Sequence, residues 1–503
     1  MTTSSADVAS GKTVNIDGTL SITTGTFTAN GSTSDIDGTL TINGSGIYDA
    51  DGTFDATSGT VQFTGSGGTL KLGGATVTSI GASFVHGTGT VEYDYAGNQS
   101  VKARNYYNLE IDGSSTSDVK SVVNSFTIDN NLTVSSTSAF DVLARTITVT
   151  GASDVNGTLN INGSGILDAN GSFDATSGSI TMDGTARLQL NSTVTSLGTL
   201  DDAAGTVEYD QAGTQTILSA PTYYDLEIDG SGSKRTDGNT STNGNVTITA
   251  GTLDIDFGND NLTIGGNFAN SGTLDATNQT ITFSGSTQNT SSIIDDNTVD
   301  LVVNKSSSGG ITFQGASSFD NVTISDGYLD IGAYTFNADN TISIATDGTL
   351  KIPNGGTFDA DGQHSVDEVA QMMSASNVRF WSLTDHDTIS GWEGAKSAAE
   401  KEGIVFIPGV ELTCMPGLEA DADVMKKHQR ERASDSWHLL AYFPDIDFQS
   451  EQHLHFKTWL APLGEGRIPR MVAMVEKLGE LGMPIDLDAV LARAGESVGR
   501  PHL

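Results

Sequence analysis

Imidazole and carboxylate groups recur at the ends of three short apolar segments in the C-terminal part of the chain. SLTDHDT carries His386, PGVEL carries Glu411 25 residues later, and WHLLAYF carries His438. Where strands and helices alternate, the side chains that follow neighbouring strands gather at one edge of the sheet. Histidine and carboxylate ligands converging from separate strands are what a cluster of catalytic metal ions requires. These three residues therefore predict a metal centre.

The elements that would position these residues follow a helix-and-strand pattern from His364 onward. Two capping boxes of the form S-x-x-E begin helices: Ser365 with Glu368, ending near Met373, and Ser390 with Glu393, ending near Gly403. We expect strands at 378–383, 404–407, 410–412 and 437–443, and further helices at 449–482 and 487–494. Strands alternating with helices indicate a parallel sheet or barrel with both faces covered.

Four motifs follow one another between residues 361 and 503: TDHDT, PGVE, HLLAYF and GRPHL. In this order they resemble the PHP (polymerase and histidinol phosphatase) family of metal-dependent phosphoesterases, in particular the branch that acts on nucleoside bisphosphates and short RNA ends. The resemblance implies that residues 363–503 form an α/β fold, an incomplete PHP-type (β/α) barrel. It also implies hydrolysis of small nucleotide phosphate esters with divalent manganese, zinc or magnesium ions.

The resemblance gives six residues a role. The metal ligands would be Asp361, His386, Glu411 and His438, and substrate phosphate would meet Arg500 and His502. Two family ligands are missing, because the histidines of the opening motif HxHTxxSDG fall on Asn354 and Gly356. The family's later ligands, a further histidine and an Asp-x-His pair, would follow Leu503. Since such an enzyme needs clustered ions, we expect weak binding of one ion and negligible turnover.

Residues 1–362 differ in composition from the rest of the chain. They hold 48 of the 59 glycines, no tryptophan, and 36 aspartates against four glutamates. Aspartate favours turns whereas glutamate favours helices, so this bias indicates strands and turns. The net charge of −38 divides as −29 for residues 1–362 and −9 for residues 363–503. We place a domain boundary between these two segments.

A repeat of 20 or 21 residues runs through the first of these segments. IDGTLSI at Ile16 returns as IDGTLTI at Ile36, and a longer repeat brings GTVEYDYAGNQ at Gly89 back as GTVEYDQAGTQ at Gly205. Each short segment alternates apolar residues with Thr, Ser or Asn and is closed by Gly, Asn or Asp. The pattern predicts an all-β fold, a right-handed parallel β-helix or solenoid, in which each coil buries its apolar residues against its neighbours.

This region resembles the β-strand repeats of adhesin-like bacterial surface proteins, which implies a cell-surface or secreted location and cell-surface partners. The turns DADG at Asp49 and DANG at Asp168 fit ordinary turn chemistry better than calcium binding, because the full calcium-binding loop patterns are absent. For the tyrosine pairs that begin at Tyr106 and Tyr223, packing is favoured over sugar stacking. A structural role is favoured for His86 over a role as a ligand.

The strong negative charge argues against a nucleic-acid duplex or an anionic membrane as a partner. No apolar run reaches the ~20 residues of a transmembrane helix, and the start MTTSSADVASGKTV lacks the features of a signal peptide. Two functions remain: a PHP-type phosphoesterase by lineage, inactivated by its missing ligands, or a structural and adhesive surface solenoid with an inert C-terminal fragment. Because nucleotide phosphatases act inside cells, the two parts imply different locations. The sequence FDADG, which satisfies both the repeat and the family motif, favours a chimeric chain.

Overall fold

In the computed structural model, the chain folds mostly as a parallel β-solenoid of about 18 turns, with few helices. The structure describes residues 5–115, 117–306, 308–353, 357–360, 366–375, 378–414, 437–444, 447–448, 450–465, 472 and 475. Two compact units result: Met1–Ser292 with Asn304–Gly309, and Ile293–Val303 with Gly310–Leu503. The predicted domain boundary at residue 362 lies outside the described residues and stays a prediction.

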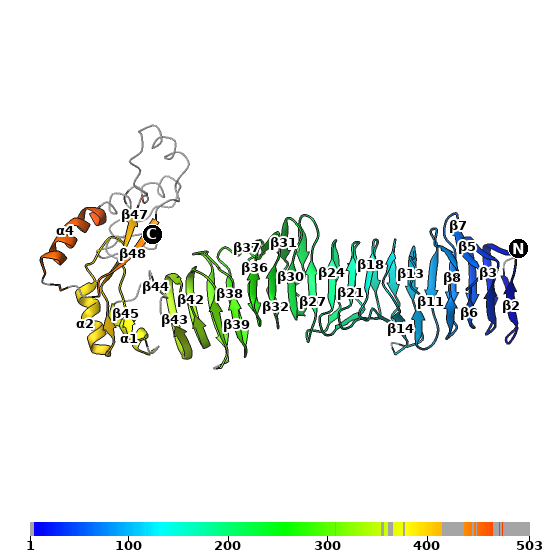
Figure 1. Cartoon of the computed structure of the whole chain (residues 1–503), viewed down its shortest axis with the longest axis horizontal. Helices are drawn as coiled ribbons and strands as arrows, with labels where there is room; N and C mark the ends of the chain where they lie inside the picture. Colours follow the sequence, from blue (N-terminus) through cyan, green and yellow to red (C-terminus); the bar gives the residue numbers. More distant parts are fainter. Residues whose placement is uncertain are drawn as a thin grey trace, which may run out of the picture. The chain divides into compact units, whose positions relative to one another are not determined.

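Strands of the first unit pair in parallel with the equivalent strands one coil later, and Figure 1 shows them as a row of aligned arrows. Leu20 lies opposite Leu40, at the spacing of the IDGTL repeat, and Leu226 lies opposite Val246. Apolar residues therefore meet apolar residues in register, and a shift by one residue would turn them toward solvent. The predicted parallel solenoid is confirmed, with one repeat for each coil.

The strands of the first unit form several sheets. One contains, in spatial order, β1 (Ser5–Val8), β3 (Thr19–Ala29), β5 (Thr39–Ala50), β8 (Thr69–Leu72), β11 (Thr90–Tyr93), β13 (Asn108–Ile111), β16 (Leu132–Val134), β19 (Ser153–Val155), β22 (Phe173–Asp174) and β25 (Val194–Ser196), with β7 (Thr60–Thr64) and β10 (Ser83–Val85) off this path. A second contains β2 (Thr13–Ile16), β4 (Thr33–Ile36), β6 (Phe54–Asp55) and β9 (Val77–Ser79). A third contains β12 (Gln99–Val101), β14 (Val119–Val122), β17 (Ala139–Asp141), β20 (Thr158–Ile161), β23 (Ser179–Met182) and β26 (Thr199–Leu200).

Two further sets of strands complete this unit. The longer set runs through β15 (Phe126–Ile128), β18 (Thr146–Val149), β21 (Ile166–Ala169), β24 (Arg187–Leu190), β27 (Thr206–Tyr209), β29 (Thr222–Tyr223), β30 (Asp225–Ile228), β32 (Thr240–Thr242), β33 (Val246–Ile248), β35 (Leu262–Ile264), β36 (Phe268–Asn270), β38 (Thr280–Gly285) and β39 (Gln288–Ser291). The shorter set contains β28 (Gln215–Ile217), β31 (Ser233–Thr236), β34 (Thr252–Asp254) and β37 (Thr273–Asp275).

The core of the first unit consists of columns of apolar side chains, one from each coil. In one column Val91, Leu109 and Leu132 lie opposite one another, and each is at most 1% exposed. Burying an aliphatic side chain of this size stabilises the fold by ~1.5–3 kcal/mol relative to leaving it exposed. Because each coil covers the next, the stack builds its core without a layer of helices.

In each long repeat, two tyrosines form a hydrogen-bonded ring inside this core: Tyr93 with Tyr106, and Tyr209 with Tyr223. The Lys102 backbone N–H donates to the Tyr93 hydroxyl, that hydroxyl lies 3.0 Å from the Tyr106 hydroxyl, and Tyr106 donates back to the Lys102 carbonyl. Tyr209 and Tyr223 form the same ring, with their hydroxyls 2.9 Å apart. Burial raises the pKa of Tyr93 to about 12. The packing interpretation is thus confirmed for Tyr106 and Tyr223, which are fully buried.

Parallel strands also open the second unit: β40 (Asp300–Lys305), whose last two residues belong to the first unit, β41 (Gly310–Phe313), β42 (Ser317–Asp330), β43 (Thr335–Lys351) and β44 (Thr357–Ala360). The two long strands β42 and β43 pair over their whole length with two register shifts. Phe313, Phe319 and Phe336 pack with ring centroids 5.3–5.7 Å apart and fill the coil interior.

Helices and short strands follow in the order α1 (Val366–Ala375), β45 (Phe380–Trp381), α2 (Trp392–Glu402), β46 (Val405–Phe406), β47 (Gly409–Cys414), β48 (Trp437–Tyr442) and α4 (Glu451–Glu465). β45 and β46 pair in parallel, but β47 and β48 pair antiparallel. The expectation of a wholly parallel sheet is therefore wrong for β48. Antiparallel partners need no crossover helix, so alternation of element types did not decide this pairing. The incomplete PHP-type (β/α) barrel remains a prediction.

Helix α2 is held by its aromatic first residue. The Trp392 indole N–H donates to the Gly409 carbonyl at 2.5 Å, and Trp392 is 1% exposed. The helix ends as expected at Gly403, whose φ of 70° suits glycine. The N-cap is Gly391, with no capping side chain, so the expected Ser390 capping box is wrong. The expected Ser365 cap lies outside the described residues. Among the described helices, none is both long and apolar enough to span a membrane.

Candidate functional sites

His386 and Glu411, two of the six predicted site residues, come together in the second unit. His386 Nε2 lies 3.4 Å from Glu411 Oε2, and the side chains are 19% and 7% exposed. The backbones also bond, because the Asp387 N–H donates to the Glu411 carbonyl and the Glu411 N–H donates to the Asp385 carbonyl. Asp387 has a φ of 54°, an uncommon backbone conformation for a residue with a side chain. The TDHDT turn and the PGVEL strand are thus fixed to each other.

Of the other four predicted site residues, the structure describes one, His438. β48 carries His438, whose backbone pairs with Thr413, two positions from Glu411. Asp361, Arg500 and His502 lie outside the described residues. Among the residues that the structure describes, no group of three or more His, Cys, Asp or Glu is arranged to hold a metal ion. A His–Glu pair offers two ligands, fewer than the four of a typical zinc site.

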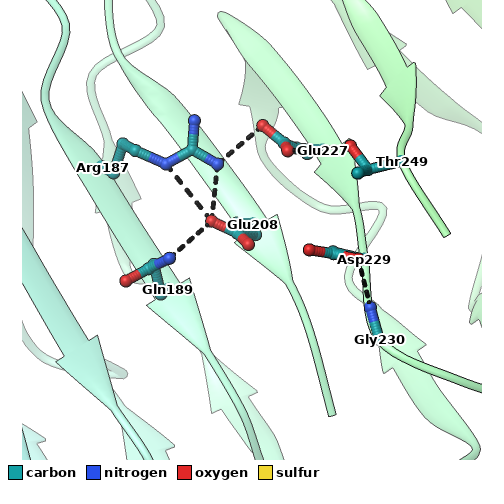
Figure 2. A network of polar contacts seen from close by, with 7 residues as sticks. All are labelled: Arg187, Gln189, Glu208, Glu227, Asp229, Gly230 and Thr249. Atoms are coloured by element: carbon teal, nitrogen blue, oxygen red, sulfur yellow. Dashed lines mark hydrogen bonds and ion pairs between the residues drawn. The ribbon is translucent and has the colours of Figure 1, made fainter. Parts of the chain in front are cut away.

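A second concentration of charge runs along the outer face of the first unit (Figure 2). Gln189, Glu208 and Glu227 lie directly opposite one another on β24, β27 and β30. Two like charges in register on adjacent strands repel each other. Arg187 resolves this conflict: its Nη2 lies 2.6 Å from Glu208 Oε2 and 2.6 Å from Glu227 Oε2. Gln189 Nε2 adds a hydrogen bond of 2.8 Å to Glu208.

The first long repeat has the same acidic column with a different cation. Glu92 and Glu110 are again opposite each other, and Lys71 lies opposite Glu92 within the column itself. Lys71 Nζ is 2.7 Å from Glu92 Oε2 and 4.0 Å from Asp94 Oδ2. Burial followed by repulsion from Glu92 raises the pKa of Glu110. Each long repeat thus stacks two glutamates beside a single cation.

Each long repeat also contains one buried lysine. Lys120 and Lys234 are fully buried, and each lies opposite an inward glutamine, Gln99 or Gln215. The Lys120 ammonium donates to the carbonyls of Tyr95 and Gly97 at 2.7 and 3.0 Å. Burial lowers the pKa of both lysines. These charges therefore cap backbone carbonyls in place of water.

Two smaller expectations concern the turns. Asp168 lies in strand β21, and its carboxylate accepts hydrogen bonds from the Thr148 hydroxyl on the neighbouring strand β18 and from the Asn170 amide. His86 Nε2 lies 3.1 Å from Asp129 Oδ2, and its ring stacks on Tyr107. His86 thus contacts residues of neighbouring coils, which agrees with its structural interpretation.

Comparison with known proteins adds no relative. No protein-family model matches this chain, and no curated protein matches it. The PHP and adhesin resemblances therefore stay as expectations based on short motifs and repeat style.

Sequence reasoning missed the charged column, although one signal pointed to it. The only glutamates in residues 1–362 are Glu92, Glu110, Glu208 and Glu227. All four lie in the two columns, at identical places in the TVEYD and LEIDG segments. A rare residue type that recurs at fixed repeat positions would have indicated a shared site.

Proposed function

We propose that this protein is a structural and adhesive bacterial surface protein, in which the solenoid is the working part and the C-terminal segment is not an active enzyme. The observation that carries this proposal is the in-register stacking of parallel coils, cross-linked on the outside by ion pairs such as Arg187 with Glu208 and Glu227. Stacked coils of this kind present long, regular faces, which suits display and contact rather than chemistry at one cleft.

A surface role predicts where the chain is found. In cells that naturally produce the protein, antibodies against the solenoid should label intact cells, and added protease should remove that label. Beads coated with the full chain should bind cell surfaces more than beads coated with a heat-unfolded sample. Labelling only after permeabilisation, or equal binding by folded and unfolded samples, would refute the surface proposal.

A second candidate concerns the His386 and Glu411 pair, because their side chains lie 3.4 Å apart. We infer that this pair, with His438 and Asp361, binds one divalent manganese, zinc or magnesium ion weakly. Arg500 and His502 would meet a phosphate group of a small nucleotide. Calorimetric titration of the full chain with manganese or zinc tests the site: Glu411→Gln should reduce the binding, whereas Glu393→Gln, at an exposed position of α2, should not.

A further inference from the structure

One turn sequence, Tyr-Asp-x-Ala-Gly-x-Gln, occurs twice in the first unit, at 93–99 and 209–215. Its glutamine is buried and fixes the turn of the preceding coil. Gln99 Nε2 donates to the carbonyls of Leu72 and Gly74 at 2.7 and 2.9 Å. Gln215 Nε2 donates in the same way to the carbonyls of residues 190 and 192. The two turns are therefore equivalent parts of the stack.

The aspartate of this turn has a buried side-chain oxygen that lacks a hydrogen-bond donor within the described part of the chain. Oδ1 of Asp94 and Oδ1 of Asp210 are both buried and accept no hydrogen bond from the described residues. A buried carboxylate oxygen without a donor is destabilised, because it loses water and gains nothing in return. The same defect at both copies shows that it belongs to the turn and not to one local irregularity.

Carboxylates outnumber cations around each of these aspartates. The groups that face Asp94 are Glu92, Asp49, Asp51, Lys71 and Lys120. Those that face Asp210 are Glu208, Asp168, Asp229 and Lys234.

The nearby cations are engaged elsewhere. Lys71 Nζ is 2.7 Å from Glu92 but 4.0 Å from Asp94. The Lys120 ammonium donates to the Tyr95 and Gly97 carbonyls, on the backbone of the turn itself. Neither lysine therefore makes a close contact with the aspartate of the first turn.

We propose that these two turns are proton-sensitive elements: on mild acidification Asp94 and Asp210 each take up a proton, and the folded solenoid becomes more stable. Burial, followed by repulsion from the glutamate two residues earlier, raises the pKa of each aspartate to about 6. The ordinary value is 3.8, so between these two values the folded chain binds more protons than the unfolded chain. The contribution to stability is fully present below the ordinary value and is lost as the pH rises through about 6.

Asp118 works in the opposite direction. Hydrogen bonds from the backbone N–H and hydroxyl of Ser114 lower its pKa, so its contribution is lost as the pH falls. The net pH dependence of the whole chain therefore mixes both effects. A comparison of variants isolates the two turns.

The test compares full-length wild type with the double variant Asp94→Asn/Asp210→Asn by thermal unfolding at about pH 5 and about pH 7.5. An amide copies the protonated aspartate, so the variant should melt a few degrees higher than wild type at the higher pH and equal to it at the lower. The control is Asp55→Asn/Asp174→Asn, which also removes two equivalent carboxylates, but ones that accept bonds from threonine. This control should not melt higher than wild type at the higher pH.

A second measurement does not depend on unfolding. Infrared difference spectra between the two pH values should show loss of aspartate carboxylate in wild type and a smaller loss in Asp94→Asn/Asp210→Asn. The proposal is overturned if this double variant has the same pH dependence of melting as wild type, or if its infrared difference equals that of wild type.

Discussion

Arg187 joins two coils that carry like charges in register: its guanidinium lies 2.6 Å from the carboxylates of both Glu208 and Glu227 (Figure 2). The two glutamates face each other on adjacent parallel strands. The ion pairs of Arg187 thus connect three successive coils. The side chain of Glu208, on the middle coil, is only 5% exposed. Contacts of this kind add specificity to a stack whose core is built from repeated apolar columns.

Removing the Arg187 guanidinium should weaken the stack. In Arg187→Met the buried Glu208 carboxylate loses its charged partner and faces Glu227 directly, so we expect a loss of about 1–3 kcal/mol in the free energy of unfolding. Urea denaturation followed by circular dichroism measures this loss.

Two further variants control that experiment. Arg145 is exposed and donates to the backbone carbonyls of Val123 and Ala144, so Arg145→Met should cost much less. Adding Glu208→Gln to Arg187→Met should restore part of the stability, because it removes the repulsion. Equal losses for the Arg187 and Arg145 variants would show that the ion pairs contribute nothing measurable.

Lys120 should stabilise the fold even though its charge is buried. Lys120→Met keeps most of the buried volume but leaves the carbonyls of Tyr95 and Gly97 without their donor. A buried carbonyl without a partner costs about 1–3 kcal/mol, so this variant should lower the melting temperature clearly. The exposed Lys12 provides the matched change: if Lys12→Met lowered the melting temperature as much as Lys120→Met, the capping role would be disproved.

Gly74 shows how closely the coils approach. A Cβ atom added there would lie 1.9 Å from the carbonyl oxygen of Gly52, a backbone atom of the preceding coil. Gly74→Ala should therefore force the coils apart and cost about 1–3 kcal/mol or more. At Gly18 nothing lies within 4 Å of the added atom, so Gly18→Ala should change the stability little. Comparable denaturant midpoints for the two variants would contradict the close approach.

The coil architecture could be predicted because each repeat carries its own register. IDGTL recurs at the coil spacing, and its leucines then pair as Leu20 with Leu40. For the tyrosines, the repeat predicted that the side chains are packed inside. It did not predict their hydrogen bonds with the Lys102 backbone, because these depend on turn geometry that no periodicity encodes.

The charged contacts could not be predicted from the pattern. Arg187 reaches Glu227 across 40 residues of sequence, because Glu227 lies two coils further along the stack. Because lysine is rarely buried, Lys120 would be expected to face solvent, yet strand β14 places it on the inward face together with Val122. In the candidate metal site His386 and Glu411 lie together, whereas the antiparallel β48 follows from tertiary pairing that motif spacing does not encode.

We propose that this chain works through its solenoid and not as a phosphoesterase. The most direct measurement is the release of phosphate from a nucleoside 3′,5′-bisphosphate by the full-length protein with manganese, beside the Glu411→Gln variant. We expect turnover no higher for the wild type than for the variant. Manganese-dependent turnover that Glu411→Gln abolishes would contradict it.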